Sequence, residues 1–320
     1  GLLHSTASAY LLKEIDESDK QAGEMVGLID RAKQLSLPLS VSTADQLFTS
    51  TFKYPGYEKV YATLSYSNIV IDELQAYNPE IAAAILWGLK EVTELGSKFC
   101  LMTATLPGFY LDFVKENLRD FVIERRFLPV SKHRIELLND NIIGYCDSIV
   151  ASWKEKGKVL VVVNTVKQAQ KLYEELKKRL KNESENNLML LHSGFILRDR
   201  SSKEKRLLDK DNPFKGIVVS TQVVEASLDI DFPVLFTEIA PADSLIQRMG
   251  RVERKIREGK LNLEKPNVLI FWSDETSGVG SVYERSLVSG TGKLLENYSG
   301  KTVSEEDKQD IVNALYYSDN

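Results

Sequence analysis

Residues 67–77, SNIVIDELQAY, contain the feature that decides the fold. A short apolar run, 69–71, ends in two adjacent carboxylates, Asp72 and Glu73. Such a run is typical of a strand that is buried in a parallel sheet. The two carboxylates that follow it either cap a turn and face solvent, or hold a ligand. The rest of the chain has to separate these two interpretations.

Strand patterns and helix patterns alternate along most of the chain. Apolar strands separated by amphipathic helices indicate an α/β fold, in which helices cover both faces of parallel sheets. Long helices are predicted at 79–95 and 166–181. The predicted strands are 39–42, 68–72, 98–103, 158–164, 187–192, 216–221, 234–239 and 267–272.

The length of 320 residues suggests about two domains. The basic stretch 125–141, RRFLPVSKHRIELLNDN, has no clear periodicity and is the expected boundary. We therefore expect a first domain at 1–130, a second at 131–275 and a helical region at 276–320. The last predicted helix opens with Ser304 and Asp307 at capping-box spacing.

Composition limits the class of protein. With 43% apolar and 27% charged residues, the chain is typical of a soluble globular protein, and no apolar run approaches a membrane span. Cys100 and Cys146 lie in apolar surroundings and are predicted to be buried, reduced thiols, which fits the cytoplasm. A net charge of −5 argues against a uniformly basic nucleic-acid binder, so any such contact must be local.

Small polar residues follow other strands as they follow 68–72. Thr103 and Thr105 come after the next predicted strand, and Thr221 with Gln222 after a later one. Ligands of parallel α/β sheets bind at the carboxyl ends of the strands. This repetition favours the ligand interpretation of Asp72 and Glu73.

The segment 247–254, QRMGRVER, places Arg248, Arg251 and Arg254 at steps of three, which predicts one side of a helix. A solvated basic face is the alternative. No acidic residue precedes Arg251 by four positions, and Gly250 permits close approach of another group. Guanidinium groups without internal partners favour an anion, and phosphate suits their geometry.

Five segments resemble motifs II, III, IVa, V and VI of superfamily 2 helicases: VIDELQAY, MTATLP, LLHSGFILRDR, VVSTQVVEASLDID and APADSLIQRMGRVER. More narrowly, they resemble the helicase of the type I CRISPR-associated helicase–nuclease. LLHSTASAYLL (2–12) and VSTADQLFTSTF (41–52) are similar to that family's segments between motifs Ia and II. The resemblance covers 1–275 and implies tandem RecA-like domains, the first incomplete at its N-terminus.

The resemblance also implies site residues for ATP. Asp72 would hold Mg²⁺, and Glu73 would orient and deprotonate the water that attacks the γ-phosphate. Arg251 and Arg254 would act as arginine fingers across the cleft between domains. The other implied nucleotide-binding residues are Asp229, Gln247 and Gly250.

For DNA, the resemblance implies contacts to the sugar–phosphate backbone of a single strand, which position it without reading its sequence. Gln75, Thr103 and Thr105 would couple these contacts to the ATP site. Gln75 replaces a histidine that is common in the family, and Glu253 replaces a small or polar residue. The implied DNA-binding residues are Thr43, Asn164, His192, Ser193 and Thr221.

No G-x-x-x-x-G-K-[ST] phosphate-binding loop occurs in the sequence. SGTGKLL (289–295) is similar, but Leu294 follows the lysine and a helical pattern precedes the segment, so we interpret it as a false match. We expect the true loop before residue 1 and an isolated chain that is inactive towards ATP. The three histidines form no His-Asp doublet, so no nuclease centre is expected.

The parent protein is therefore expected to be an ATP-dependent 3′-to-5′ single-stranded DNA translocase of CRISPR interference. It would work with a metal-dependent nuclease and a crRNA-guided surveillance complex, and not at a membrane. Two alternatives remain open: a superfamily 2 helicase outside CRISPR, and a non-catalytic fragment that binds DNA or a partner.

Overall fold

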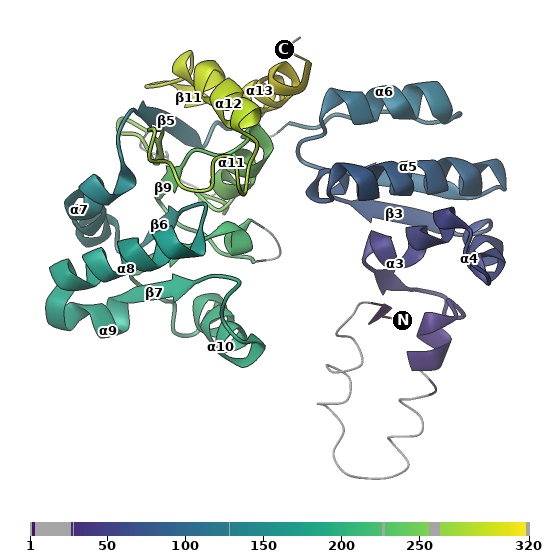
Figure 1. Ribbon diagram of the computed structural model, residues 1–320, viewed down its shortest axis with the longest axis horizontal. Helices are drawn as coiled ribbons and strands as arrows, with labels where there is room; N and C mark the ends of the chain where they lie inside the picture. The colour runs from purple at the N-terminus through teal and green to yellow at the C-terminus, as the bar shows by residue number, and fades with distance from the viewer. Residues whose placement is uncertain are drawn as a thin grey trace. The chain divides into compact units, whose positions relative to one another are not determined.

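The computed structural model describes residues 2–3, 27, 29–127, 129–225, 228–255 and 263–317. The chain divides into two compact units, residues 1–124 and 125–320, which are coloured along the chain in Figure 1. The division falls six residues before the predicted boundary at 130. Most of the predicted family segment 2–12 lies outside the described residues.

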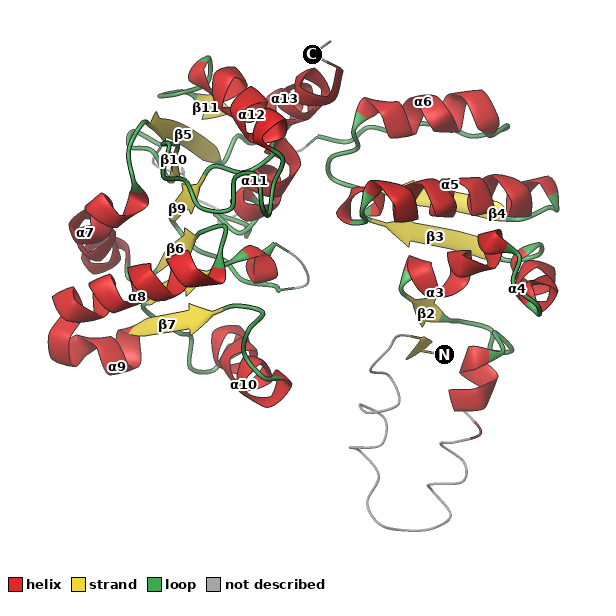
Figure 2. Cartoon of the chain, in the orientation of Figure 1, coloured by secondary structure: helices red, strands yellow, loops and turns green. Residues whose placement is uncertain are grey.

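Unit 1 is built around two parallel strands, β3 (Asn68–Asp72) and β4 (Lys98–Met102), in which Asp72 pairs with Met102. A second parallel pair joins β1 (Leu2–Leu3) to β2 (Val41–Ser42). Figure 2 shows the helices around β3 and β4. These helical elements are α3 (Ala44–Phe48), η1 (Thr49–Phe52), α4 (Tyr57–Leu64), η2 (Leu74–Ala76), α5 (Pro79–Glu94) and α6 (Gly108–Asn117).

Helix α5 follows directly from the opening stretch of sequence. The Asn78 side chain accepts a hydrogen bond from the Ile81 N–H at 2.9 Å, and Pro79 occupies the first turn, where it costs no hydrogen bond. Ile85 and Leu89 are fully buried in the core of unit 1. This packing fixes the end of β3, where Asp72 and Glu73 lie.

Unit 2 contains a seven-stranded sheet in the order β11-β5-β10-β9-β6-β8-β7. All pairs are parallel except β11 with β5. Every residue of β6, β8 and β9 is buried, as expected for a parallel sheet covered on both faces. The strands are β5 (His133–Leu138), β6 (Val159–Val162), β7 (Leu188–Leu191), β8 (Ile217–Ser220), β9 (Leu235–Glu238), β10 (Val268–Phe271) and β11 (Thr302–Val303).

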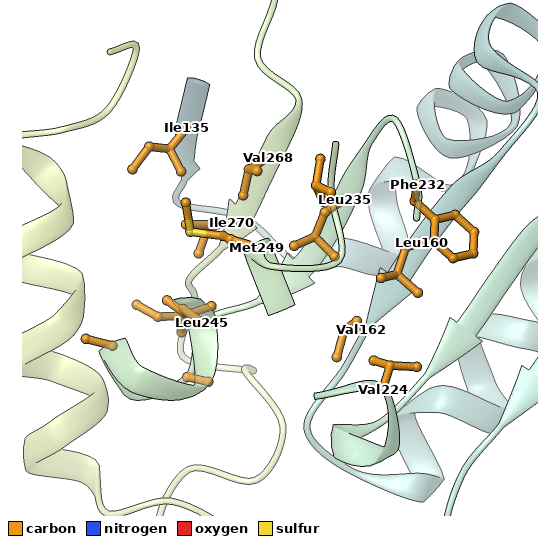
Figure 3. Packing of buried hydrophobic residues seen from close by; sticks show 14 of the residues in the cluster. Ile135, Leu160, Val162, Val224, Phe232, Leu235, Leu245, Met249, Val268 and Ile270 are labelled. Carbon is orange, nitrogen blue, oxygen red and sulfur yellow. The ribbon is translucent and has the colours of Figure 1, made fainter. Parts of the chain in front are cut away.

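Two hydrophobic clusters cover the two faces of this sheet. Helices α7 (Cys146–Lys156) and α8 (Val166–Leu180) pack on one face, against Val161 and Phe236 among others. Helices α11 (Ala242–Met249), α12 (Arg285–Glu296) and α13 (Glu305–Tyr317) pack on the other. Figure 3 shows part of this second cluster. The remaining helical elements are η3 (Ile142–Tyr145), η4 (Lys181–Glu183), α9 (Ser184–Asn187), α10 (Leu197–Leu208) and η5 (Gln222–Val224).

The α/β class is confirmed, and each predicted strand is present to within two residues at either end. The division between the units falls at the start of the predicted boundary stretch 125–141, but this stretch also contains β5, a strand that was not predicted. Its buried residues include His133, so a histidine hides the expected apolar alternation. The region 276–320 is not separate from the second domain, because β11 pairs with β5 and α12 and α13 complete its core.

The SGTGKLL segment lies inside α12, so the structure agrees that it is not a phosphate-binding loop. A Cβ atom on Gly292 would lie 2.5 Å from the Trp272 ring, which gives this glycine a packing role. The Ser304–Asp307 capping box is confirmed, since the Asp307 N–H donates to Ser304 Oγ at 3.0 Å.

The two cysteines differ from each other. Cys146 is buried, and burial raises the pKa of its thiol to about 11. Cys100 is exposed on the outward face of β4, so its predicted burial is wrong. No helix among the described residues is long and apolar enough to cross a membrane.

Candidate nucleotide and nucleic-acid sites

The first site lies at the carboxyl end of β3 in unit 1. Asp72 is the last residue of the strand and is exposed. Glu73 has a φ of 53°, in the left-handed region, and its N–H donates to the Met102 carbonyl oxygen at 2.9 Å. A non-glycine residue held in this conformation costs on the order of 1–3 kcal/mol, and such strain clusters at functional sites.

Three predicted residues gather near the Glu73 carboxylate. The Gln75 amide donates to Glu73 Oε2, and Thr103 Oγ1 lies 2.7 Å from Gln75 Oε1 and 3.4 Å from Glu73 Oε2. The Thr105 N–H donates to Thr103 Oγ1 at 3.1 Å. The structure therefore brings Gln75, Thr103 and Thr105 together with Glu73, and the amide of Gln75 orients the carboxylate.

Thr43 is exposed and occupies the N-cap position of α3, but its side chain makes no capping hydrogen bond. The next residue, Ala44, donates its N–H to Tyr77 Oη at 2.9 Å. Tyr77 closes the stretch that contains Asp72 and Glu73. This bond ties the segment of the predicted DNA contact to the segment of the predicted ATP site.

In unit 2, Asn164 follows β6 and is 1% exposed. Its Nδ2 donates to the carbonyl oxygens of Ile239 at 2.8 Å and Ser277 at 2.9 Å, and its Oδ1 accepts from Arg248 at 3.0 Å. The buried amide is thus engaged inside the unit. The predicted DNA contact of Asn164 stays a prediction, and in this geometry its amide group already has three partners within the unit.

His192, Ser193 and Thr221 lie at the ends of the neighbouring strands β7 and β8. The His192 ring stacks on Phe195 with centroids 4.3 Å apart, and its Nδ1 accepts the Gly194 N–H at 3.1 Å. Burial, together with Lys203, lowers the pKa of His192, which favours the neutral ring. Ser193 is exposed, whereas Thr221 is 2% exposed and donates its N–H to the Leu191 carbonyl oxygen.

The arginines of 247–254 do not form the predicted helical row, because α11 ends at Met249 and Val252 forms a β-bridge with Phe232. The premise that these arginines lack internal partners is also wrong. Arg248 is fully buried and bonds to Glu225 at 2.7 Å. Arg251 donates to three backbone carbonyl oxygens, those of Val224 (2.8 Å), Glu225 (2.5 Å) and Leu228 (2.8 Å).

Arg254 is different, because its side chain is 44% exposed. Its Nε lies 3.3 Å from Oδ1 of Asp229, another predicted nucleotide contact, so the structure brings these two residues together. Gln247 is half-buried on α11. Gly250 is exposed at the end of α11, where a Cβ atom would lie 3.2 Å from the Gln247 carbonyl oxygen.

The sequence analysis did not identify two carboxylates at this edge, the buried Glu238 and the largely buried Glu225. Glu238 ends β9 and accepts the Asn164 N–H at 2.8 Å and the Ser277 hydroxyl at 2.5 Å. Glu225 bonds to Arg248, yet burial raises its pKa and outweighs the opposing effect of Arg248. Burial also raises the pKa of Glu238. An acidic residue that ends an apolar run, as Asp72 does, was the available signal for Glu238.

Parallel sheets covered by helices, with polar residues gathered at the carboxyl ends of their strands, define the α/β class of protein to which RecA-like domains belong. Comparisons with known proteins narrow this class. Residues 155–257 match the family model described as CRISPR-associated nuclease/helicase Cas3, C-terminal.

Curated relatives and solved structures agree with this match. The chain is 29% identical to the CRISPR-associated nuclease/helicase Cas3 of Methanothermobacter thermautotrophicus over 98% of its own length and 39% of the relative's. It is 28% identical to the CRISPR-associated nuclease/helicase Cas3 of Streptococcus thermophilus, over 87% of this chain and 34% of that relative. The structure of T. fusca Cas3 with AMPPNP superposes with a TM-score of 0.81 at 22% identity, over 99% of this chain and 42% of that one. The resemblance to the helicase core of CRISPR-associated helicase–nucleases is confirmed, and the chain spans about two fifths of these proteins.

Proposed function

We propose that this chain is part of the ATP-hydrolysing core of a CRISPR-associated helicase that moves 3′ to 5′ along single-stranded DNA. One observation carries the proposal: Glu73, held in a strained conformation at the end of β3, is oriented by Gln75, which also contacts Thr103 of the neighbouring strand end. Adjacent carboxylates with a fixed geometry suit metal-assisted phosphoryl transfer to water.

In this proposal Glu73 positions the attacking water and accepts its proton. Because Gln75 donates to Oε2, the second carboxylate oxygen, Oε1, is the one offered to the water. Thr103 contacts both Gln75 and the backbone of Thr105. A movement of 103–105 would therefore be transmitted to the Glu73 carboxylate through the hydrogen bonds of Thr103 to Gln75 and of Gln75 to Glu73. These residues therefore link hydrolysis to movement.

Asp72 fits a magnesium ion. It is a single exposed carboxylate, and no cluster of three metal-binding side chains occurs in the described part of the chain. Mg²⁺ is usually held by one or two carboxylates together with water and substrate phosphates. When bound, the ion would neutralise charge on the phosphates.

ATP as the nucleotide is supported by relatives of the same fold. Solved structures of T. fusca Cas3 carry ATP, ADP or AMPPNP in their names. On the side of unit 2, we propose that Arg254, Asp229, Gln247 and Gly250 contact the nucleotide. Since residues 1–320 contain no phosphate-cradling loop, we propose that this loop belongs to a part of the protein outside them.

For DNA, we propose that Thr43, His192, Ser193 and Thr221 contact the sugar–phosphate backbone. Hydroxyl and backbone donors of this kind position a strand without reading its bases. The partners proposed are a crRNA-guided surveillance complex and a metal-dependent nuclease. A structure named as a CRISPR RNA-guided surveillance complex before nicking contains a chain of similar fold, with a TM-score of 0.70.

A helicase outside CRISPR is the competing proposal. Fold alone does not separate the two, because Mycobacterium smegmatis Lhr and yeast Dbp5 also superpose, with TM-scores of 0.56 and 0.51. The sequence match to Cas3 relatives over nearly the whole chain favours CRISPR.

The test is the Glu73→Gln variant in a protein that joins these residues to a phosphate-binding loop. Loss of the proton acceptor should lower DNA-stimulated ATP hydrolysis at least about a hundredfold, while ATP binding persists. Glu80→Gln, an exposed change in the first turn of α5, is the matched control. If Glu73→Gln hydrolyses ATP at a rate near that of the control, the proposed role of Glu73 is wrong. If unwinding requires a 5′ tail and not a 3′ tail, the proposed 3′-to-5′ direction of movement is wrong.

A further inference from the structure

Arg248 lies where the carboxyl ends of three neighbouring strands of unit 2 meet. Its side chain is completely buried, although a guanidinium group is among the costliest groups to remove from water. A guanidinium carries five N–H donors, and here each has an acceptor. The acceptors are Glu225 Oε1 (2.7 Å), Thr237 Oγ1 (2.8 Å), the Glu238 carbonyl oxygen (2.9 Å), Asn164 Oδ1 (3.0 Å) and Tyr283 Oη (3.1 Å).

These acceptors come from four separate segments. Glu225 follows β8, Asn164 follows β6, and Thr237 belongs to β9, which are neighbours in the sheet order β9-β6-β8. Tyr283 closes the loop between β10 and α12. One side chain thus links three strand ends and a loop at the edge where ligands of parallel sheets bind.

Two further side chains, those of Glu238 and Arg251, form hydrogen bonds at the same edge of the sheet. The Glu238 carboxylate accepts the backbone N–H groups of Asn164 at 2.8 Å and Ser277 at 3.0 Å. Arg251 binds the backbone carbonyl oxygens of Val224, Glu225 and Leu228. Arg248 therefore fixes the Glu225 side chain, and Arg251 fixes the backbone of 224–225 and of Leu228.

We infer that Arg248 is a positioning residue that sets the geometry of residues 221–225 after β8 and ties them to the loop 273–283. The role of Thr221 as a DNA contact rests on the function proposed above. Stability alone does not explain Arg248, because well-packed apolar residues often replace a buried ion pair without loss of stability. The five-donor geometry instead fixes one arrangement of the strand ends.

Lysine cannot take this role. Its ammonium group is a single point with three donors, so it can hold Glu225 but cannot also reach acceptors on opposite sides. The test is therefore Arg248→Lys in the 320-residue chain. Arg179→Lys is the control, because Arg179 likewise pairs with carboxylates, those of Asp147 and Glu175, but on helices away from this edge.

The measurement is amide hydrogen exchange resolved by residue. In Arg248→Lys, we expect the Glu225 and Ser277 amides to exchange about tenfold faster or more, with β7 and α8 unchanged. Unchanged exchange at these two amides, or equal acceleration across the whole sheet, would overturn the inference. If Arg248→Lys does not fold, Tyr283→Phe removes only the 3.1 Å bond and should accelerate exchange at 277–283 alone.

A second measurement determines the affinity of both variants for a dT oligonucleotide. Arg248→Lys should weaken it about tenfold relative to Arg179→Lys, because the segment that bears Thr221 is no longer held. Equal affinities for the two variants would count against the positioning role. If the wild-type chain itself does not bind the oligonucleotide, the proposed function fails, and the exchange experiment still decides the role of Arg248.

Discussion

At the scale of residues, Arg251 and Arg254 lie three positions apart and have different environments. Arg251 is half-buried and bonds to three backbone carbonyl oxygens of its own unit. Arg254 is exposed and pairs only loosely with Asp229, at 3.3 Å. The sequence could not distinguish them, because the partners of Arg251 are backbone atoms that any residue would supply.

Replacement by alanine should separate the two arginines. Arg251→Ala leaves three carbonyl oxygens without their donor, so we expect it to lower the free energy of unfolding by about 2–3 kcal/mol. Arg254→Ala should change it by less than about 1 kcal/mol, because exposed ion pairs contribute little. In a protein that joins residues 1–320 to a phosphate-binding loop, Arg254→Ala should nevertheless reduce ATP turnover. Urea unfolding and ATPase assays on the same preparations measure both effects, and similar stabilities for the two variants would contradict this distinction.

His133 shows how one buried residue can make stability depend on pH. It is 3% exposed, its Nε2 lies 3.1 Å from the Val252 carbonyl oxygen, and its Nδ1 has no partner among the described residues. Burial, with a smaller effect of Lys308, lowers the pKa of His133 from 6.5 to about 3. The folded protein therefore keeps this ring neutral at mildly acidic pH.

The sign of the effect follows from proton uptake. Between about pH 6.5 and 3 the unfolded chain binds a proton at His133 that the folded chain does not, so stability falls as pH falls, by about 1.4 kcal/mol per pH unit. His133→Gln keeps a donor for Val252 but cannot titrate. Its stability should fall less steeply than that of the wild type from pH 6.5 to about 5, whereas the two slopes should agree above pH 7.5. Equal slopes over the acidic range would show that His133 titrates normally.

At the scale of elements, most of the parallel strands were predictable because they are short apolar runs, several of which have a polar residue at their end. Strand β5 was missed because a buried histidine and a preceding basic run conceal its pattern. The proximity of Gln75, Thr103 and Thr105 to Glu73 was predictable as well, whereas their roles stay predictions. The network around Arg248 was not, because it joins segments that are distant in sequence through hydrogen bonds that no local pattern records.

Helix α12 gives a test of the false phosphate-loop match. In Gly292→Ala the new methyl group would meet the Trp272 ring, so we expect a loss of about 1–3 kcal/mol in unfolding free energy. Gly290→Ala is the control in the same helix, because its Cβ would meet only the flexible end of Leu315, at 2.9 Å. There the gain in helix propensity, up to about 1 kcal/mol, should offset most of the contact. Thermal unfolding compares the two variants, and a stable Gly292→Ala protein would reject the packing role.

At the scale of the whole molecule, the net charge of −5 decides how DNA can be bound. An acidic chain repels a polyanion at long range, so affinity must come from local contacts to phosphates at the strand ends. The residues proposed for these contacts carry hydroxyl groups and an imidazole that is mostly neutral, not positive charges. Affinity should therefore be weak, and it should not depend on base sequence.

Fluorescence anisotropy with labelled oligonucleotides tests this expectation on the 320-residue chain. The Kd should be similar for dT and mixed-sequence strands and should rise only slightly with salt, since the logarithmic slope is about 0.7 for each phosphate that a cationic side chain neutralises. Because few cations take part, the slope should correspond to only a few such contacts. A strong preference for one base sequence that persists from low to moderate salt would require base-edge recognition. The carboxyl edges of these sheets would then bind DNA in a way that a translocase, which must pass every sequence alike, could not use.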